Sequence, residues 1–303
     1  MNTLYWHSGL NNYRQHSLRI GIRNNTYHLE LLDTEHCLDL SIDQLFAEHV
    51  QSRSSKHVGV LYSGGLDSEC VLRSLAIQKI PQIAYTLRLL LNGYSINTHD
   101  LYYSEKFCRM NHIEQRIIDL DVDKFFEGTH HSLLEKYRIT QFHVSTHFWL
   151  IKQIDDFVVM GGDYNWPWHD KRILSPQRHN YGCYDLFLKD IAHEGIGNML
   201  SHSMSSNLLF IKHHLDQADS NFVASWTKLP LFKAKLLESM GLGTFEPRLR
   251  SYGWENMDDM VIDYRKINRD LIKAFGNCQS RITWNSDVAK VLNSLPASNT
   301  QYL

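Results

Sequence analysis

A Ser-Gly-Gly-Leu-Asp-Ser hexamer at residues 63–68 is the feature that most constrains how this chain folds. It lies between an apolar run at 57–62, typical of a buried strand, and a run at 66–78 in which apolar residues recur with helical spacing. The adjacent glycines Gly64 and Gly65 allow the backbone to turn sharply and to approach a ligand closely. Backbone N–H groups in such a turn, together with the start of a helix, bind anions such as pyrophosphate. The hexamer therefore predicts a strand, a phosphate-binding turn and a helix.

Asp67 indicates that the site also holds a metal ion. A carboxylate is a poor neighbour for phosphate unless a divalent cation lies between them, so we predict that Asp67 binds Mg²⁺. The hydroxyls of Ser63 and Ser68 add hydrogen-bond donors.

Serine, glycine and aspartate are also ordinary turn and cap residues, so the context of the hexamer decides its interpretation. A strand precedes it, a helix follows it, and Pro81 ends that helix. The apolar face of the predicted helix consists of Leu66, Cys70, Val71 and Leu75. The alternative phosphate motif, G-x-x-x-x-G-K-[ST], is excluded because no Gly-Lys pair occurs in the chain.

At these residues the chain resembles the PP-loop, or N-type ATP pyrophosphatase, superfamily. Residues 58–68 read Val-Gly-Val-Leu-Tyr-Ser-Gly-Gly-Leu-Asp-Ser and are similar to V-G-V-L-L-S-G-G-L-D-S in the synthetase domain of asparagine synthetase and β-lactam synthetase. Weaker matches follow in the same order at 98–101, 112–119, 144–147 and 158–163. The resemblance covers about residues 40–165.

The resemblance implies that ATP is bound on the hexamer, is cleaved between its α and β phosphates, and transfers AMP to a substrate oxygen. It implies an adenine nucleotide alpha hydrolase-like, or HUP-type, fold. Asp163, at the end of the last match, becomes the second expected Mg²⁺ ligand beside Asp67. The residues expected to bind ATP are Leu61, Ser63, Gly64, Gly65, Leu66, Asp67, Ser68, Leu87, Gly161 and Gly162.

The chain departs from this family in two places. The family's last motif has two acidic positions, whereas here Asp163 is followed by the aromatic-rich segment 164–168. Glutamine-using members carry a glutaminase domain that begins with a nucleophilic cysteine, but Asn2 stands at position 2 and only 62 residues precede Ser63. We therefore expect the amine to be free ammonia, a substrate amine, or ammonia from a separate donor protein.

Cations outside the hexamer are expected to offset the charge of departing pyrophosphate. The candidates flank an apolar segment and a proline turn near residues 229–232 and 245–247, and Arg suits bidentate contacts with phosphate or carboxylate. As an alternative, each is an ordinary basic residue at a helix end. Together with Asp67 the predicted catalytic residues are Lys233, Arg248 and Arg250, with Lys235 as a further candidate.

Composition and cysteine spacing disfavour several functional classes without excluding a nucleic acid as partner. The net charge is −2 at pH 7, so no strong electrostatic case exists for a nucleic acid or an anionic membrane as partner. The N-terminus lacks the apolar core of a signal peptide, and we expect a cytoplasmic protein. The five cysteines form no C-x-x-C pair, which argues against a zinc site and against a disulfide framework. Within the superfamily, this disfavours the 7-cyano-7-deazaguanine synthases, which bind zinc, and the tRNA thiolation enzymes, which need a catalytic cysteine.

Alternating strand and helix patterns predict an α/β fold with a doubly wound parallel sheet, preceded by a small β-hairpin at 17–32 and followed by a mainly helical region. Ligands in such sheets bind at the carboxyl ends of strands, where 63, 87–89 and 161–163 fall. The expected domains are 1–50, 51–175 and 176–303. The expected strands are 83–89, 116–120 and 157–160, and the expected helices are 42–52, 98–110, 123–137, 142–155, 185–193, 198–215 and 225–240.

Three functional hypotheses remain. In the first, the protein is an AMP-forming ligase that adenylates a small-molecule carboxylate or carbonyl oxygen for attack by an amine. In the second, it adenylates a nucleobase or nucleoside, for which the aromatic segment 164–168 offers a stacking surface. In the third it is a non-catalytic nucleotide-binding module, which the presence of both Asp67 and Asp163 disfavours.

Overall fold

The computed structural model describes the parts of the chain that surround the hexamer and form the main sheet. The described residues are 5–6, 17–23, 26–32, 41–54, 56–137, 142–162, 168–169, 172–173, 181–197, 199–200, 229–248 and 279–284. The predicted helix at 198–215 lies almost entirely outside them.

A parallel sheet forms the centre of the molecule, in the order β11-β8-β4-β5, with β7 paired to the far side of β5. A short strand, β6 (Tyr94–Ser95), extends the end of β5 as an antiparallel hairpin. The parallel strands are β4 (Val58–Leu61), β5 (Gln82–Leu91), β7 (Glu114–Asp121), β8 (Phe157–Met160) and β11 (Gly195–Ile196). This confirms the predicted α/β fold with a parallel sheet.

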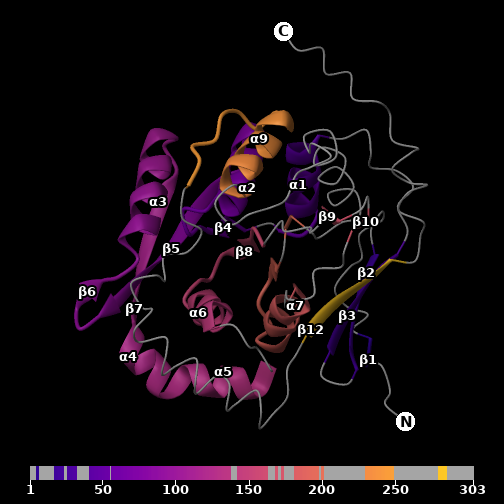
Figure 1. The fold of residues 1–303 in the computed structure, drawn as a ribbon, viewed down its shortest axis with the longest axis vertical. Helices are drawn as coiled ribbons and strands as arrows, with labels where there is room; N and C mark the ends of the chain where they lie inside the picture. Colours follow the sequence, from indigo (N-terminus) through magenta and orange to yellow (C-terminus); the bar gives the residue numbers. More distant parts are fainter. Residues whose placement is uncertain are drawn as a thin grey trace.

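Helices cover both faces of this sheet, which makes it doubly wound (Figure 1). On one face lie α2 (Leu66–Ile77), α3 (Thr98–Met110) and α9 (Leu229–Ser239), with α1 (Ile42–Gln51) packed beside α2. The other face is covered by α6 (Phe142–Ile151) and α7 (Tyr181–Asp190). Between β7 and α6 the chain forms α4 (Val122–Lys124), a π-helical turn at Phe125–Thr129 and α5 (His130–Tyr137).

The two central strands are buried along their whole length, because helices cover them from both sides. All four residues of β4 and all four of β8 are buried, which explains why both read as uninterrupted apolar runs. The predicted apolar face of α2 is confirmed, since Leu66, Cys70, Val71 and Leu75 all belong to the core.

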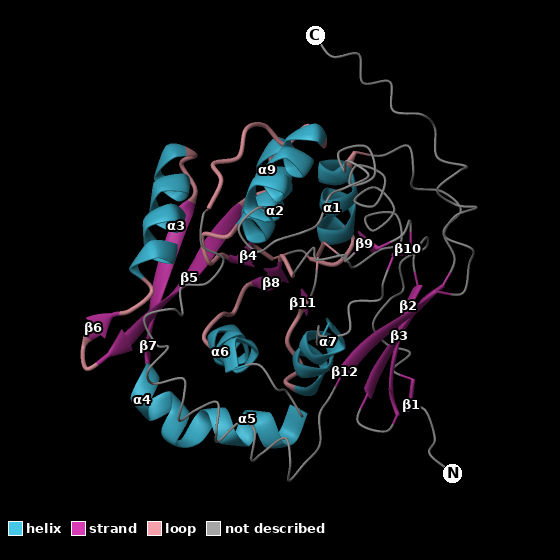
Figure 2. Cartoon of the chain, in the orientation of Figure 1, coloured by secondary structure: helices cyan, strands magenta, loops and turns pink. Residues whose placement is uncertain are grey.

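A second, smaller sheet contains the predicted hairpin (Figure 2). Strands β2 (Ser17–Arg23) and β3 (Thr26–Leu32) pair antiparallel with Arg23 opposite Thr26, as the sequence predicts. β1 (Tyr5–Trp6) pairs with β2, and β12 (Gln279–Trp284) pairs in parallel with β3. Two further short strands, β9 (Trp168–His169) and β10 (Arg172–Ile173), form a separate antiparallel pair.

The sheets extend beyond the predicted boundary at residue 175. β11 is the edge of the parallel sheet, and β12 belongs to the N-terminal sheet, although both lie in the region expected to be mainly helical. β11 has only two residues and β12 pairs with a hairpin far away in the sequence. Neither strand therefore gives a clear periodic pattern, which explains why they were not predicted. The domain boundaries themselves stay predictions.

Candidate functional site

The hexamer forms the turn between β4 and α2, at the carboxyl edge of the parallel sheet. From β4 the chain proceeds to β5 and β7 on one side, whereas β8 and β11 lie on the other side. The turn therefore occupies the point at which the strand order reverses, where ligands bind in open α/β sheets.

Gly64 is fixed as glycine by both its backbone conformation and its surroundings. Its φ is +81°, and a Cβ atom there would lie 2.5 Å from the carbonyl oxygen of Asp100 in α3. Gly65 caps α2 with an ordinary extended conformation, φ −78° and ψ 158°. The close approach of α3 thus requires a residue without a side chain at position 64.

The first turn of α2 supplies N–H groups that have no partner within the helix, and the helix dipole adds partial positive charge there. The end of β8 lies directly against this turn, because a Cβ atom on Gly161 would lie 3.0 Å from backbone atoms of Asp67 and Ser68. The Ser68 hydroxyl donates to the Gly65 carbonyl, 3.2 Å away, and Ser63 is exposed. Two of the three segments expected to meet, the one at 63 and the one that begins at Gly161, therefore lie together at the helix N-terminus.

Asp67 and Lys233 form an ion pair at this helix N-terminus. The Nζ atom of Lys233 lies 2.7 Å from Oδ2 of Asp67, and both side chains are largely buried, with exposed fractions of 12% and 21%. Lys233 comes from α9, which packs along α2 (Figure 1). The structure thus brings together two of the predicted catalytic residues.

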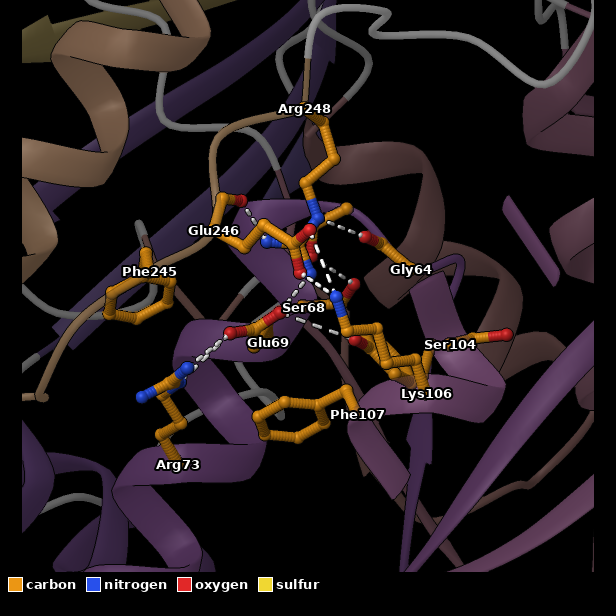
Figure 3. Close-up of polar contacts among 12 residues, drawn as sticks. Gly64, Ser68, Glu69, Arg73, Ser104, Lys106, Phe107, Phe245, Glu246 and Arg248 are labelled. Carbon is orange, nitrogen blue, oxygen red and sulfur yellow. Dashed lines mark hydrogen bonds and ion pairs between the residues drawn. The ribbon is translucent and has the colours of Figure 1, made fainter. Parts of the chain in front are cut away.

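Arg248 is directed toward the turn rather than toward solvent, and it is 6% exposed. Its Nε donates to the carbonyl oxygen of Gly64 at 3.0 Å, and its Nη2 forms an ion pair with Glu69 (Figure 3). Its guanidinium lies over the ring of Tyr103, 4.8 Å from the centroid. Because protein groups surround this guanidinium, we interpret Arg248 as a support of the turn rather than as the predicted clamp on the ligand.

Glu69 is the centre of a buried charge network that the sequence did not reveal. Its carboxylate, 1% exposed, accepts hydrogen bonds from Arg73 at 2.7 and 2.9 Å and from the Tyr62 hydroxyl at 3.3 Å. Burial raises the pKa of Tyr62 above its ordinary value, and the Glu69 carboxylate raises it further. The only signal in the sequence was a glutamate beside the apolar face of α2, four residues before an arginine.

Residues 242–248, which we call the clasp, contact the turn and the helices beside it. The Arg73 guanidinium donates to the Leu242 carbonyl at 3.2 Å and lies 4.3 Å from the Phe245 ring centroid. Lys106 of α3 pairs with Glu246 at 2.8 Å in an exposed contact (Figure 3). The clasp therefore contacts both helices that border the turn.

The remaining predicted residues have different positions. The side chains of Leu61 and Leu66 are each 6% exposed in the core, so only their backbone can face a ligand. The Leu87 carbonyl accepts a hydrogen bond from Asn97 at 2.8 Å, and Gly162 has φ +80° directly after Gly161. Lys235 is exposed. Asp163 and Arg250 lie outside the described residues.

Other reactive residue types do not form a second centre in the described part of the chain. Cys70 and Cys108 are buried, and burial raises the pKa of the Cys108 thiol to about 12. His147 contacts the Tyr184 hydroxyl at 2.8 Å. No cluster of three or more potential metal ligands of the His, Cys, Asp or Glu type occurs among these residues. Nor does any described helix have the length and apolar character needed to cross a bilayer.

Fold and site together define an α/β protein with a glycine turn, a carboxylate and a lysine at the point of the parallel sheet where the strand order reverses.

No family model and no curated protein matches the sequence. One similar solved structure is NMN synthetase from Francisella tularensis, with 16% sequence identity and a TM-score of 0.29. The match covers 39% of this chain and 50% of that chain. The chain thus spans half the length of that synthetase.

Two further structures are similar over more of the chain. The U34-tRNA thiolase NcsA from Methanococcus maripaludis has 13% identity over 88% of this chain and 83% of that one, with a TM-score of 0.32. An NH3-dependent NAD synthetase from Campylobacter jejuni has 14% identity over 76% and 93%, with a TM-score of 0.30. Likenesses at this level carry no argument about activity, so we derive the function from the residues of the site.

Proposed function

We propose that this chain is an ATP-dependent, AMP- and pyrophosphate-forming ligase. It binds the triphosphate of ATP on the turn at 63–68 and adenylates a carboxylate or carbonyl oxygen of a small molecule, which an amine then attacks. The observation that carries the proposal is the Asp67–Lys233 pair at the N-terminus of α2, beside a turn in which Gly64 has a positive φ and a Cβ atom would lie 2.5 Å from the Asp100 carbonyl oxygen.

The turn and the first turn of α2 suit a phosphate chain. Gly64 and Gly161 keep side chains away from the helix N-terminus, and N–H groups there favour anions. The carboxylate of Asp67 is the chemistry that Mg²⁺ prefers, and Mg²⁺ in nucleotide sites takes one or two carboxylates together with phosphate oxygens and water. The described residues therefore fit Mg²⁺ through Asp67, with Asp163 as the second predicted ligand. When bound, Mg²⁺ would supply charge neutralisation on the phosphates.

In this proposal Lys233 acts on the charge that develops during the reaction. An acceptor oxygen attacks the α phosphorus, the bond from phosphorus to the bridging α–β oxygen breaks, and pyrophosphate leaves with the bonding electrons. An ammonium group near these oxygens stabilises the transition state more than the ground state, which is the condition for catalysis. In the second step the amine attacks the activated carbon and AMP leaves.

For the amine source and for the acceptor, the proposal names only the chemical class. We propose ammonia or a substrate amine, supplied freely or by a separate protein. The segment 164–168, on which the nucleobase alternative depends, lies outside the described residues, so that alternative stays a hypothesis.

Isotope exchange between pyrophosphate and ATP tests the proposal without knowledge of the amine. The protein is incubated with ATP, Mg²⁺, labelled pyrophosphate and pools of carboxylic acids. We expect label to enter ATP with one pool, and AMP to form when ammonia is added. Asp67→Asn should abolish exchange, whereas Asp156→Asn, at the opposite end of the sheet beside Tyr85, should retain it. ADP and phosphate as the products would contradict the proposed chemistry.

A further inference from the structure

The clasp holds one peptide of the turn in a fixed direction. Arg248 donates from Nε to the carbonyl oxygen of Gly64 at 3.0 Å, and the guanidinium is buried. In a planar trans peptide the carbonyl and the following N–H point in opposite directions. The bond to Arg248 therefore directs the N–H of Gly65 away from the clasp.

The backbone at Gly64 is flexible enough that the hydrogen bond from Arg248 affects the orientation of the Gly64–Gly65 peptide. A glycine at φ +81° has no Cβ to oppose rotation of the adjoining peptide plane, so a flip costs less there than at other residues. A flipped peptide would present its carbonyl oxygen, rather than the N–H of Gly65, to an anion at the helix N-terminus. Anion binding requires the unflipped direction.

Glu69 keeps Arg248 in place. It is the residue directly after the hexamer, is 1% exposed, and is fixed from three sides by Arg73, Tyr62 and Arg248. Its carboxylate is bound to two guanidinium groups, one from its own helix and one from the clasp (Figure 3). The direction of the Gly64 peptide thus depends on a buried ion pair that joins residues 179 positions apart.

We infer that Arg248 is a positioning residue which, anchored by Glu69, sets the anion-binding direction of the Gly64–Gly65 peptide. This inference rests on the proposed function only for the identity of the anion, ATP. It predicts that loss of Arg248 affects nucleotide affinity and the local order of the turn at temperatures at which the protein remains folded.

Arg248→Met is the principal test, because Glu69 stays paired with Arg73 and the buried charge remains compensated. Two readouts are compared at a temperature well below the unfolding midpoint. The first is amide hydrogen exchange of peptides covering 62–68 in the ligand-free protein, and the second is the dissociation constant for ATP. We expect faster exchange and about tenfold weaker ATP binding, the equivalent of ~1.4 kcal/mol for one charge-assisted hydrogen bond.

The double variant Glu69→Gln/Arg248→Met separates positioning from general stability. Glu69→Gln alone leaves Arg248 buried without a carboxylate and should lower the unfolding midpoint, whereas the double variant removes that charge and should recover part of the loss. Exchange at the turn and ATP affinity should remain impaired in the double variant. Glu246→Gln, which removes an exposed pair from the same clasp, should match the wild type in both readouts.

If the exchange rate of the turn and the ATP affinity of the double variant both equal those of the wild type, Arg248 acts through stability alone. That result would overturn the inference. Unchanged exchange in Arg248→Met would do the same. If the wild type itself does not bind ATP, the proposed function fails, while the exchange comparison still decides the role of Arg248.

Discussion

Lys233 reaches across 166 positions of sequence to place its ammonium group 2.7 Å from the carboxylate of Asp67. The two side chains come from α9 and α2, helices that pack against each other above the sheet. Their meeting places a cation and a potential metal ligand at the same helix N-terminus, where phosphate binding is most favourable.

Lys233→Met should therefore impair chemistry more than ATP binding. We expect the rate of pyrophosphate exchange to fall by about 10² to 10³, the range found when a preorganised electrostatic group is removed, with a smaller change in ATP affinity. The measurement is the exchange rate at saturating ATP beside a direct titration of ATP binding. Lys235→Met provides the matched control, because Lys235, although a candidate from the sequence, is exposed and, two positions along the same helix, does not share a face with Lys233. A Lys233 variant with wild-type exchange would remove this lysine from the mechanism.

Gly64→Ala should destabilise the turn through two separate causes, the positive φ and the contact with α3. Gly93 offers a matched control, since its φ is +80° and a Cβ atom there would meet nothing within 4 Å. We expect Gly93→Ala to lower the free energy of unfolding by about 1 kcal/mol, the cost of the left-handed conformation. Gly64→Ala should cost more and should abolish ATP binding. If urea titrations give the same loss in free energy of unfolding for both variants, α3 moves to accommodate the methyl group and the contact adds no cost.

Gly161→Ala tests the contact between the end of β8 and the first turn of α2. The added methyl group would lie 3.0 Å from three backbone atoms of Asp67 and Ser68, which have no rotamer with which to avoid it. We expect weaker ATP binding and a lower unfolding midpoint. Gly128→Ala, in the π-helical turn with open space around the new Cβ, should leave both unchanged or raise stability.

His130 should contribute to the loss of stability in acid. It is 2% exposed, lies 2.7 Å from the Ser145 hydroxyl, and has its pKa lowered to about 3 by burial and then by His131. Between the unfolded pKa near 6.5 and this value only the unfolded chain binds the proton, so stability falls as the pH falls through that window. His130→Asn should make the decline less steep, by up to about 1.4 kcal/mol per pH unit once the pH is well below the unfolded pKa. Parallel curves for the two proteins in urea titrations from pH 7 to 5 would contradict the assignment.

Local patterns in the sequence predicted most of the architecture around the site. Thr98–Met110 and Phe157–Met160 begin and end where the sequence pattern indicated, and the two strands of the hairpin at 17–32 pair with Arg23 opposite Thr26. The hexamer predicted the turn itself, because an apolar strand pattern precedes its glycine pair and a helical pattern follows it. These features depend on neighbours in sequence.

Features that depend on distant neighbours were not predictable in this way. The sequence indicated Lys233 and Arg248 as cations of the site but not which partners they have, and the buried role of Glu69 was missed. The buried Glu69 carboxylate has two cationic partners: Arg73 lies four residues away in the same helix, whereas Arg248 lies 179 residues further along the chain. No periodic pattern records the pair with Arg248, so only the fold reveals it.

The parallel pairing of β12 with β3 has a consequence for the order of events during synthesis. Because the N-terminus leaves the ribosome first, the hairpin at 17–32 is exposed with an open edge until residues 279–284 have been made. An open hairpin edge is a template for pairing with other chains, so we expect a risk of aggregation during this interval. Arg248 also emerges late, so a nascent chain carries the glycine turn long before it carries the residue that orients it.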